Sequence, residues 1–187
     1  MEGFSSVCGG FRIQYGIMNA VRIIEVCDGP LIAVVETLAQ RIWREHYIPL
    51  VGRAQVEYML EKFQSRAAIS IQINKEGFFY YLFEDREGAW VGYGAVIPRS
   101  DELFLSKLYV SAENRGRGYG RSAVEFVEKI AENKGLPKIS LNVNKKNTGS
   151  IRAYQKFGFV IIRPFVTDVG GGFVMDDYRM EKLLSLS

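Results

Sequence analysis

The segment Arg115–Arg121, RGRGYGR, decides how this sequence is interpreted. Its three glycines occupy alternate positions among three arginines, and an apolar helical pattern begins directly afterwards. The preceding segment Leu103–Val110, LFLSKLYV, is typical of a β-strand. In a strand, glycine-rich turn and helix, free backbone N–H groups and the positive end of the helix dipole meet an anion. The segment therefore predicts a phosphate-binding loop.

Spacing separates the known kinds of phosphate loop. A dinucleotide fingerprint needs glycine three positions after Gly118, where this chain has Arg121. A Walker loop needs Lys and then Ser or Thr after its last glycine, and neither follows Gly120. The residues match the pattern R-x-x-G-x-G, as Arg115, Gly118 and Gly120. A glycine-rich turn that only connects a strand to a helix remains the alternative.

The rest of the C-terminal half alternates between helical and strand patterns. Apolar residues at helical spacing predict a helix over 118–133, which Gly135 and Pro137 end. A short helix follows over Ile151–Phe157, with Asn147 and Thr148 as caps and Gly158 beyond its end. Strands are predicted at Lys138–Val143, Phe159–Phe165 and Phe173–Glu181, the last two separated by the flexible segment Asp168–Gly172.

The N-terminal half begins with a strand and continues with helices. Val21–Val26 is rich in β-branched residues and precedes the turn cluster Asp28-Gly29-Pro30. Helical spacing predicts helices from Leu31 to Pro49 and over Arg53–Gln64, and a short third helix at Ser65–Ile73. A β-hairpin is expected from the aromatic segments Phe78–Glu84 and Ala89–Val96.

Length and composition favour one globular domain. The chain has 187 residues and a net charge of only +3, which gives little reason to expect a nucleic-acid partner. The cysteines, Cys8 and Cys27, are too few for a disulfide framework or a zinc cluster, so we expect a reduced cytoplasmic protein without a metal. Neither a membrane span nor a signal peptide is expected. Residues 1–18 are interpreted as a poorly specified leader, with Met18 as an alternative start, and residues 19–187 as the single domain.

Two segments together resemble a known family. LYVSAENRGRGYG, Leu108–Gly120, resembles the coenzyme A pyrophosphate loop of the GNAT superfamily of acetyl-CoA-dependent N-acetyltransferases. LNVNKKNTGSIRAYQKFGF, Leu141–Phe159, resembles the second cofactor segment of that family. The residues that carry the second resemblance are Asn147, Ala153, Tyr154, Gly158 and Phe159. The motifs cover roughly residues 103–182, whereas residues 20–100 agree only in element order.

A softer resemblance concerns the early helices. Ile42–Ser65 looks like the paired helices of a bacterial subgroup that acetylates small amines, including polyamines. The superfamily resemblance implies an α/β fold with one mixed, mostly antiparallel sheet of about seven strands and about four or five flanking helices. It also implies that the fourth and fifth strands splay apart and hold the pantetheine arm between them.

The same resemblance implies how acetyl-CoA is bound. Backbone groups at Leu108, Tyr109 and Val110 would meet the pantetheine arm, as in pairing to an exposed strand edge. Asn147 would bond the same arm, although its alternative role is a plain helix cap. For Arg117 an ordinary solvated position is equally plausible. The residues expected to bind the pyrophosphate are Arg115, Gly116, Arg117, Gly118, Tyr119, Gly120 and Arg121.

The implied chemistry is direct attack of a neutral amine on the thioester. Tyr154 would be the general acid that protonates the leaving thiolate, since its ordinary pKa of about 10 keeps it protonated at neutral pH. The alternative for Tyr154 is simple packing of its ring on the core. The backbone N–H of Val110 would stabilise the oxyanion. The general base stays open among Glu84, Glu102, Glu45 and His46, of which His46 is more typical of a packed side chain.

The acceptor is expected to be a primary amine of a small molecule. A polyamine-like cation is one option, attracted by Asp176 and Asp177 with Glu45 and Glu57, although an acidic pair near a strand start usually faces water. The alternatives are acetylation of a protein N-terminus or lysine, and a coenzyme A sensor without turnover. The exposed edge expected in the last strands makes a homodimer plausible.

Overall fold

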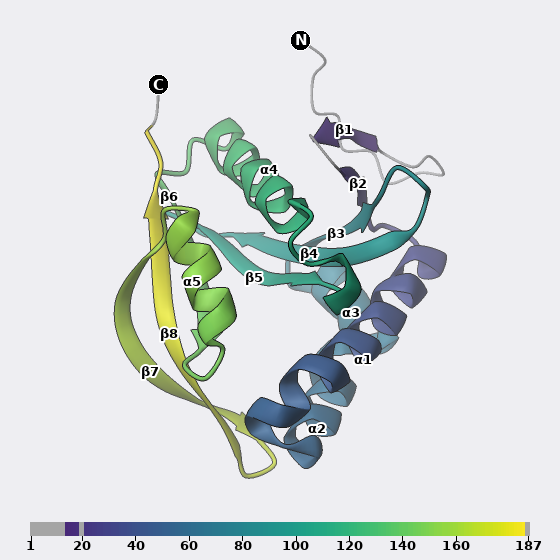
Figure 1. The fold of residues 1–187 in the computed structure, drawn as a ribbon, viewed down its shortest axis with the longest axis vertical. Coiled ribbons are helices and arrows are strands. Elements are labelled where there is room, and N and C mark those ends of the chain that lie inside the picture. The colour runs from purple at the N-terminus through teal and green to yellow at the C-terminus, as the bar shows by residue number, and fades with distance from the viewer. Residues whose placement is uncertain (1–13, 19–20, 186–187) are drawn as a thin grey trace.

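The structure is a computed structural model that describes residues 14–18 and 21–185. Over those residues it contains one eight-stranded sheet in the order β1-β2-β3-β4-β5-β6-β8-β7 (Figure 1). The strands are β1 Gln14–Met18, β2 Val21–Glu25, β3 Phe79–Glu84, β4 Trp90–Pro98, β5 Leu103–Val110, β6 Lys138–Asn144, β7 Val160–Gly170 and β8 Phe173–Leu183. The helices are α1 Gly29–Val51, α2 Arg53–Gln64, α3 Arg66–Lys75, the short 3₁₀ helix η1 Ala112–Asn114, α4 Tyr119–Asn133 and α5 Thr148–Lys156.

The sheet splits at its one parallel pair. Strands β5 and β6 are paired only over Leu103–Leu105 and Ile139–Leu141, and beyond these residues they separate (Figure 1). All other neighbouring strands are antiparallel. The mixed, mostly antiparallel sheet with a splay between these two strands confirms the predicted fold.

A bulge in β5 lies just beyond the split. Ala95 of β4 pairs with Lys107, but the next residue, Val96, pairs with Leu105. Ser106 is therefore the extra residue, and such a bulge changes the direction in which the following side chains point. It lies where β5 becomes a free strand edge.

The helices cover both faces of the sheet because strand residues alternate between faces. Ile24, Tyr80 and Leu82 pack with the buried residues of α1, α2 and α3 in one core. Ile23 and Tyr81 pack with α4 in the other core. The apolar face of α4 predicted from helical spacing is thus confirmed.

Helix α1 differs from the prediction at its end. It begins as expected, since the Asp28 carboxylate accepts a hydrogen bond from the Leu31 N–H at 2.8 Å. Proline cannot donate to the helix ladder, so Pro49 was predicted to end α1. In the structure the helix continues to Val51, and Gly52 with φ 86° terminates it. Leu50 and Val51 pack against the core, which offsets the one missing hydrogen bond.

The N-terminal strand was not predicted. Residues 14–18 were assigned to a leader, but they form β1 and pair antiparallel with β2. This strand raises the count over the described residues to eight, against about seven expected. Residues 1–13, including Cys8, lie outside the described residues, so the predicted domain boundary stays a prediction.

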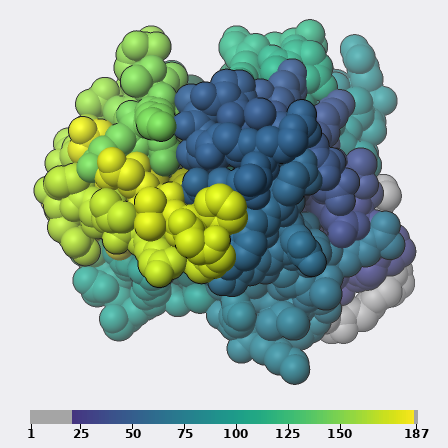
Figure 2. Space-filling view, turned by 90° about the horizontal axis from the view of Figure 1, so that it is seen from below, coloured from purple at the N-terminus to yellow at the C-terminus, as the bar shows by residue number. Residues whose placement is uncertain are grey.

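The last two strands form a long hairpin that bends toward α2. Both are longer than predicted, because β7 runs to Gly170 and β8 to Leu183. Of the predicted flexible segment, Asp168–Gly170 belongs to β7, and the chain turns at Gly171 and Gly172, with positive φ from Gly170 to Gly172. Figure 2 shows the hairpin, in yellow, directly against the blue surface of the early helices.

β7 forms the outer edge of the sheet and is largely exposed. Val160, Ile162 and Val166 are each at least half exposed on it. Such an edge is a site where a second chain can pair, so the homodimer stays a prediction. Within the described residues, no helix combines the length and the apolar character that a membrane crossing requires.

Candidate functional site

A cleft of about 940 Å³ opens where β5 and β6 separate. Its wall is formed by the free part of β5, the glycine-rich loop, the start of α4, the end of β6 and α5, and α1 and β8 contribute on the other side. The split sheet thus provides a cavity that reaches between the two layers of helices.

The free edge of β5 directs backbone groups into this cleft. The Ser111 N–H donates to the Val91 carbonyl of β4 at 3.0 Å. Backbone groups of successive strand residues point to opposite sides, so those of Val110 and Leu108 point away from β4 toward the gap. The side-chain Nε of Arg115 donates to the Val110 carbonyl at 3.2 Å. The Val110 N–H therefore points into the gap. Its role as the donor to the oxyanion stays a prediction.

The glycine-rich loop leaves the start of α4 open. Gly118 is the residue before the helix, with φ 89°, and no side chain of the described residues caps this end. The first N–H groups of a helix have no intrahelical partner, so here they are available to an anion. A Cβ atom built on Gly116, Gly118 or Gly120 would meet nothing within 4 Å, so the loop borders open space.

The predicted cofactor residues gather in this one cleft. Every one of them lines it except Arg117. Those that line it are Leu108, Tyr109, Val110, Arg115, Gly116, Gly118, Tyr119, Gly120, Arg121, Asn147 and Tyr154. Their binding roles stay predictions, and the solvated alternative for Arg117 agrees with its position outside the cleft.

Asn147 caps α5 and is buried beside the cleft. Its side-chain oxygen accepts from the Ser150 N–H at 3.3 Å, as a helix cap does. Asn147 is only 5% exposed. It lines the cleft together with His46 and Tyr47 of α1.

Tyr154 lies on α5 with its ring edge-on to Phe159, at a centroid distance of 5.6 Å. Burial, followed by the proximity of Tyr47, raises the pKa of Tyr154 above its ordinary value. The phenol is therefore protonated throughout the neutral range. Packing and proton donation, the two roles that the sequence left open, are both compatible with this position.

An aromatic cluster that sequence reasoning missed forms the inner end of the cleft. Tyr109 of β5 lies near Tyr47, Trp43 and Tyr93, with ring centroids between 5.2 and 6.2 Å from its own. Burial raises the pKa of Tyr47 and of Tyr109. These residues come from α1, β4 and β5, so only the tertiary structure brings them together.

The predicted base candidates are mostly outside the cleft. Glu84 is buried and forms an ion pair with Arg22 of β2. Glu45 is exposed and does not line the cleft. His46 does line it, and burial first, then the charge of Arg115, lowers the pKa of its imidazole.

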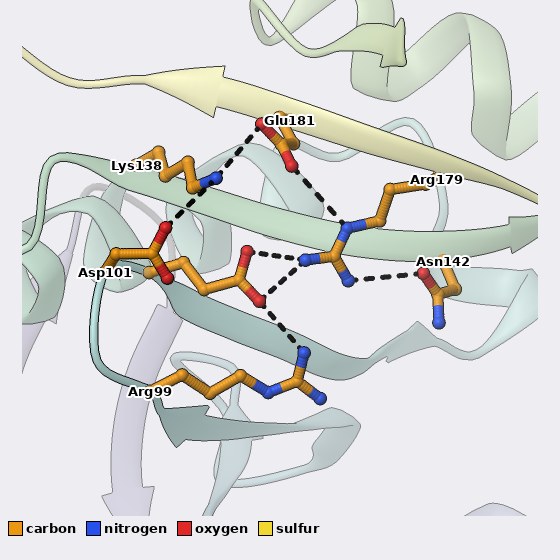
Figure 3. A network of polar contacts seen from close by, with 7 residues as sticks. Arg99, Asp101, Lys138, Asn142, Arg179 and Glu181 are labelled. Atoms are coloured by element: carbon orange, nitrogen blue, oxygen red, sulfur yellow. Dashed lines mark hydrogen bonds and ion pairs between the residues drawn. The ribbon is translucent and has the colours of Figure 1, made fainter. Parts of the chain in front are cut away.

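Glu102 belongs to an ion-pair network at the paired end of β5 and β6. Figure 3 shows its partners Arg99 and Arg179. Its carboxylate accepts two hydrogen bonds from Arg179 Nη2, at 2.6 and 2.5 Å. Arg99 donates to it at 2.9 Å. Arg179 in turn lies 3.7 Å from Glu181. The carboxylate is occupied by structural partners, and it does not line the cleft.

Two buried charged residues line the cleft that were not among the predicted bases, Asp177 and Lys107. Asp177 of β8 is 8% exposed, and its Oδ1 atom has no hydrogen-bond partner in the described part of the chain. Burial first, then Asp176, raises the pKa of the Asp177 carboxyl to about 6. Of the four carboxylates predicted to attract a cation, Asp177 alone lines the cleft. Glu57 pairs with Arg44, and Asp176 with Lys145.

Lys107, which sequence reasoning missed, follows the bulge in β5. Its Nζ donates to Gln72 Oε1 at 2.9 Å and lies 5.1 Å from the ring centroids of Phe78 and Tyr80. Burial lowers its pKa to about 7. The only signal in the sequence was one lysine within an apolar strand. Among the described residues, no cluster of three or more metal-ligating side chains occurs.

Comparison with known proteins agrees with this geometry. The profile of the acetyltransferase (GNAT) family matches residues 36–159 of the chain. An uncharacterized N-acetyltransferase of Bacillus subtilis (strain 168), YhdJ, is 24% identical over 136 residues, which cover 70% of this chain and 94% of YhdJ.

Two solved structures have the same fold. The PaiA N-acetyltransferase of Thermoplasma acidophilum, in complex with coenzyme A, superposes with a TM-score of 0.70 at 18% identity, covering 87% of this chain and 99% of that one. The spermidine/spermine N-acetyltransferase SpeG of Vibrio cholerae gives 0.61 at 17% identity, covering 88% and 92%. At these identities the likeness concerns the fold alone.

Proposed function

The chain belongs to the acetyltransferase (GNAT) family, and from this premise we propose that it acetylates a primary amine of a small molecule, with Tyr154 as general acid. As a member of this family it is an acetyl-CoA-dependent N-acetyltransferase, and acetyl-CoA is its cosubstrate. The acceptor and the roles of individual residues are the parts that need argument.

The cleft fits acetyl-CoA in three respects. The free edge of β5 offers backbone groups to an extended pantetheine arm. The uncapped start of α4 offers N–H groups to the pyrophosphate, with Arg115 and Arg121 beside them. The volume of about 940 Å³ is of the size that binds small organic ligands.

The observation that favours a small acceptor is the docking of the β7–β8 hairpin on α2. Tyr58 and Lys62 of α2 both donate to the Val169 carbonyl, at 3.1 and 2.8 Å. Gln55 of the same helix donates to the Val174 carbonyl at 2.8 Å. The hairpin therefore closes over the acceptor side of the cleft, where a protein substrate would need an open groove.

The chain's own groups would divide the chemistry as follows. Acetyl-CoA supplies an activated acetyl group, bound to sulfur as a thioester. The Val110 N–H would donate to the carbonyl oxygen as negative charge develops there. Tyr154 would give its proton to the departing sulfur. The aromatic cluster around Tyr109 would keep water from the reacting atoms.

Release of free coenzyme A thiol, measured across a panel of amines, tests this proposal. The panel should contain simple primary amines, polyamines, amino acids, aminoglycosides and peptides. We expect turnover with small primary amines and little with peptides. Turnover with peptides alone would favour the protein acetyltransferase, and tight coenzyme A binding without any turnover would favour the sensor.

The structure gives a polyamine weaker support than the sequence did. A polyamine carries several positive charges, but of the four predicted carboxylates one lines the cleft. We therefore favour an amine with a single charge near the reaction centre. The cytoplasmic location predicted from the cysteine content remains part of this proposal.

A further inference from the structure

We propose that Asp177 is the general base that takes a proton from the ammonium form of the acceptor. This inference rests on the proposed function, and it assigns the one catalytic role that the sequence left open. The argument starts from the position of Asp177 and from the unused oxygen of its carboxylate.

Asp177 lies on the far arm of the split sheet. It pairs with Asn144, the last residue of β6, at the end where β6 has separated from β5. Asn144 is itself buried and lines the cleft beside Asp177. Its side chain is fixed, because its Oδ1 atom accepts from the Lys146 N–H at 3.0 Å.

One oxygen of this carboxylate has no partner. Oδ1 of Asp177 is buried and accepts no hydrogen bond within the described residues, although buried acceptors are nearly always paired. Asp177 lines the cleft but Oδ1 is covered, so a rotation of the carboxylate is needed to bring this oxygen to a ligand. An ammonium group would supply the missing donor. A carboxylate that is unpaired without a ligand is costly to the fold, and this cost favours a functional explanation.

Asp177 lines the same cleft as Tyr154 and as Tyr47 of α1. The ring centroid of Tyr47 lies 6.2 Å from that of Tyr109, so Tyr47 connects α1 with β5. Base and acid would thus belong to one cleft, as a reaction that removes one proton and delivers another requires.

The other charged groups around Asp177 do not neutralise it. Asp176 is its neighbour on β8 and forms an ion pair with Lys145, which follows β6. Arg179 lies two residues farther on the same face and is held by Glu102 and Glu181. On β7 the opposite residue is the uncharged Phe165, and from α1 the side chains that line the same cleft are Trp43, His46 and Tyr47.

The proton balance is complete without another reactant. The ammonium proton passes to the Asp177 carboxylate, and the freed electron pair forms the N–C bond as the C–S bond breaks. The sulfur takes the Tyr154 proton, and the nitrogen loses its second proton as the amide forms, which restores the phenol. Asp177 then returns its proton to water. The net release is one proton for each acetyl group transferred.

The competing candidates fit this role less well. Glu84 and Glu102 lie outside the cleft in ion pairs. His46 lines the cleft, but burial first, and then the charge of Arg115, lowers the pKa of its imidazole, which makes it a weaker base. Lys107 precedes Val110 by three strand residues, a distance of roughly 10 Å, which places it away from the oxyanion donor.

Asp177→Asn tests the assignment, with Asp176→Asn as the matched control. The control removes an exposed carboxylate from the neighbouring position of the same strand. For wild type we expect turnover of the best panel amine to rise with pH across the titration of Asp177. Asp177→Asn should lower turnover at pH 7 at least 100-fold and remove this rise. Asp176→Asn should keep turnover at pH 7 within about two-fold of wild type, and its turnover should still rise with pH.

A second acceptor separates proton removal from a structural role. Trifluoroethylamine is largely neutral at pH 7 and needs no base, so Asp177→Asn should acetylate it at close to the wild-type rate. The thermal shift caused by coenzyme A should also be unchanged. An equal loss of turnover with both amines would show that Asp177 only maintains the structure. Loss of the thermal shift caused by coenzyme A would show the same, and either result would overturn the assignment.

Other outcomes are equally decisive. Turnover by wild type and by Asp177→Asn at the same rate would overturn the assignment and leave the proposed function intact. Silence of wild type on every amine would overturn both. Should Asp177→Asn fail to fold, Asp177→Glu replaces it, and a pH profile identical to wild type would count against the proposal.

Discussion

Lys62 of α2 donates a hydrogen bond from Nζ to the backbone carbonyl of Val169, at 2.8 Å, and so connects segments 107 residues apart in the chain. The same carbonyl accepts from the Tyr58 hydroxyl at 3.1 Å. These two bonds hold the tip of the β7–β8 hairpin on α2. The hairpin thereby contributes Val169 and Met175 to the lining of the cleft.

Removing both donors should open the acceptor side. For Tyr58→Phe combined with Lys62→Met we expect a KM for the amine raised several-fold, since each hydrogen bond contributes about 1 kcal/mol. Coenzyme A affinity should not change, because the hairpin tip does not belong to the phosphate loop. Lys75→Met, at an exposed lysine of α3, is the control. An unchanged KM would mean that the hairpin does not shape the acceptor site.

A side chain at Gly118 should abolish acetyl-CoA binding. Gly118 has φ 89° at the uncapped start of α4, so Gly118→Val strains the loop and fills the space before the helix N–H groups. Ligand at 100 times its Kd should stabilise wild type by about 2.7 kcal/mol, measured as a rise in Tm. Gly135→Val, with φ 65° at the other end of α4, should lose stability yet keep this rise. A normal rise in Gly118→Val would exclude the loop from binding.

Tyr154→Phe should separate chemistry from binding. The phenyl ring keeps the contact with Phe159, so the fold and the Kd of coenzyme A should be close to wild type. Without the phenol proton we expect kcat to fall about 100-fold or more. Pre-steady-state and steady-state rates with one amine measure this. Wild-type kcat in the variant would mean that water or another group protonates the sulfur.

Asp177 should make wild type less stable as the pH rises. Its folded pKa, about 6, lies above the ordinary value near 3.9, so the folded state favours the protonated carboxyl. The stability that it contributes is complete below pH 4 and is lost as the pH passes 6. From pH 4 to pH 7.5, the free energy of unfolding of Asp177→Asn should therefore rise relative to that of wild type by on the order of 2 kcal/mol. Urea unfolding at the two pH values measures this. A constant difference would contradict the raised pKa.

Lys107 should make wild type more stable as the pH rises, opposite to the effect of Asp177. Its folded pKa, about 7, lies below the ordinary value near 10.4, so wild type gains stability as the pH rises from 7 to 10. Lys107→Met should be more stable than wild type by on the order of 2 kcal/mol below pH 7, and this advantage should shrink toward pH 10. Gln72 would keep its hydrogen bond from Tyr80, at 2.6 Å. Lys75→Met, at an exposed lysine of α3, is the control.

The parts of the fold that local residues specify were predictable. The glycine pattern around Gly118 and the helical spacing after it describe contiguous segments, so the sequence alone predicts both the loop and α4. The prediction at Pro49 was wrong because the packing of Leu50 and Val51 outweighs one missing hydrogen bond. Strand β1 was missed because a single edge strand gains its stability from pairing with β2, which sequence periodicity does not report.

Residues close together in the chain were enough to identify the family, most of the elements and the loop expected to hold the cosubstrate. Which charged residues enter the cleft depends on the tertiary structure. Asp177 reaches it through the register of β8 on β6, and Lys107 lies just beyond a bulge in β5. Nothing in the sequence distinguishes the neighbouring residues Asp176 and Asp177. Their difference arises because successive strand residues face opposite sides, and only the buried side carries an unpaired charge into the site.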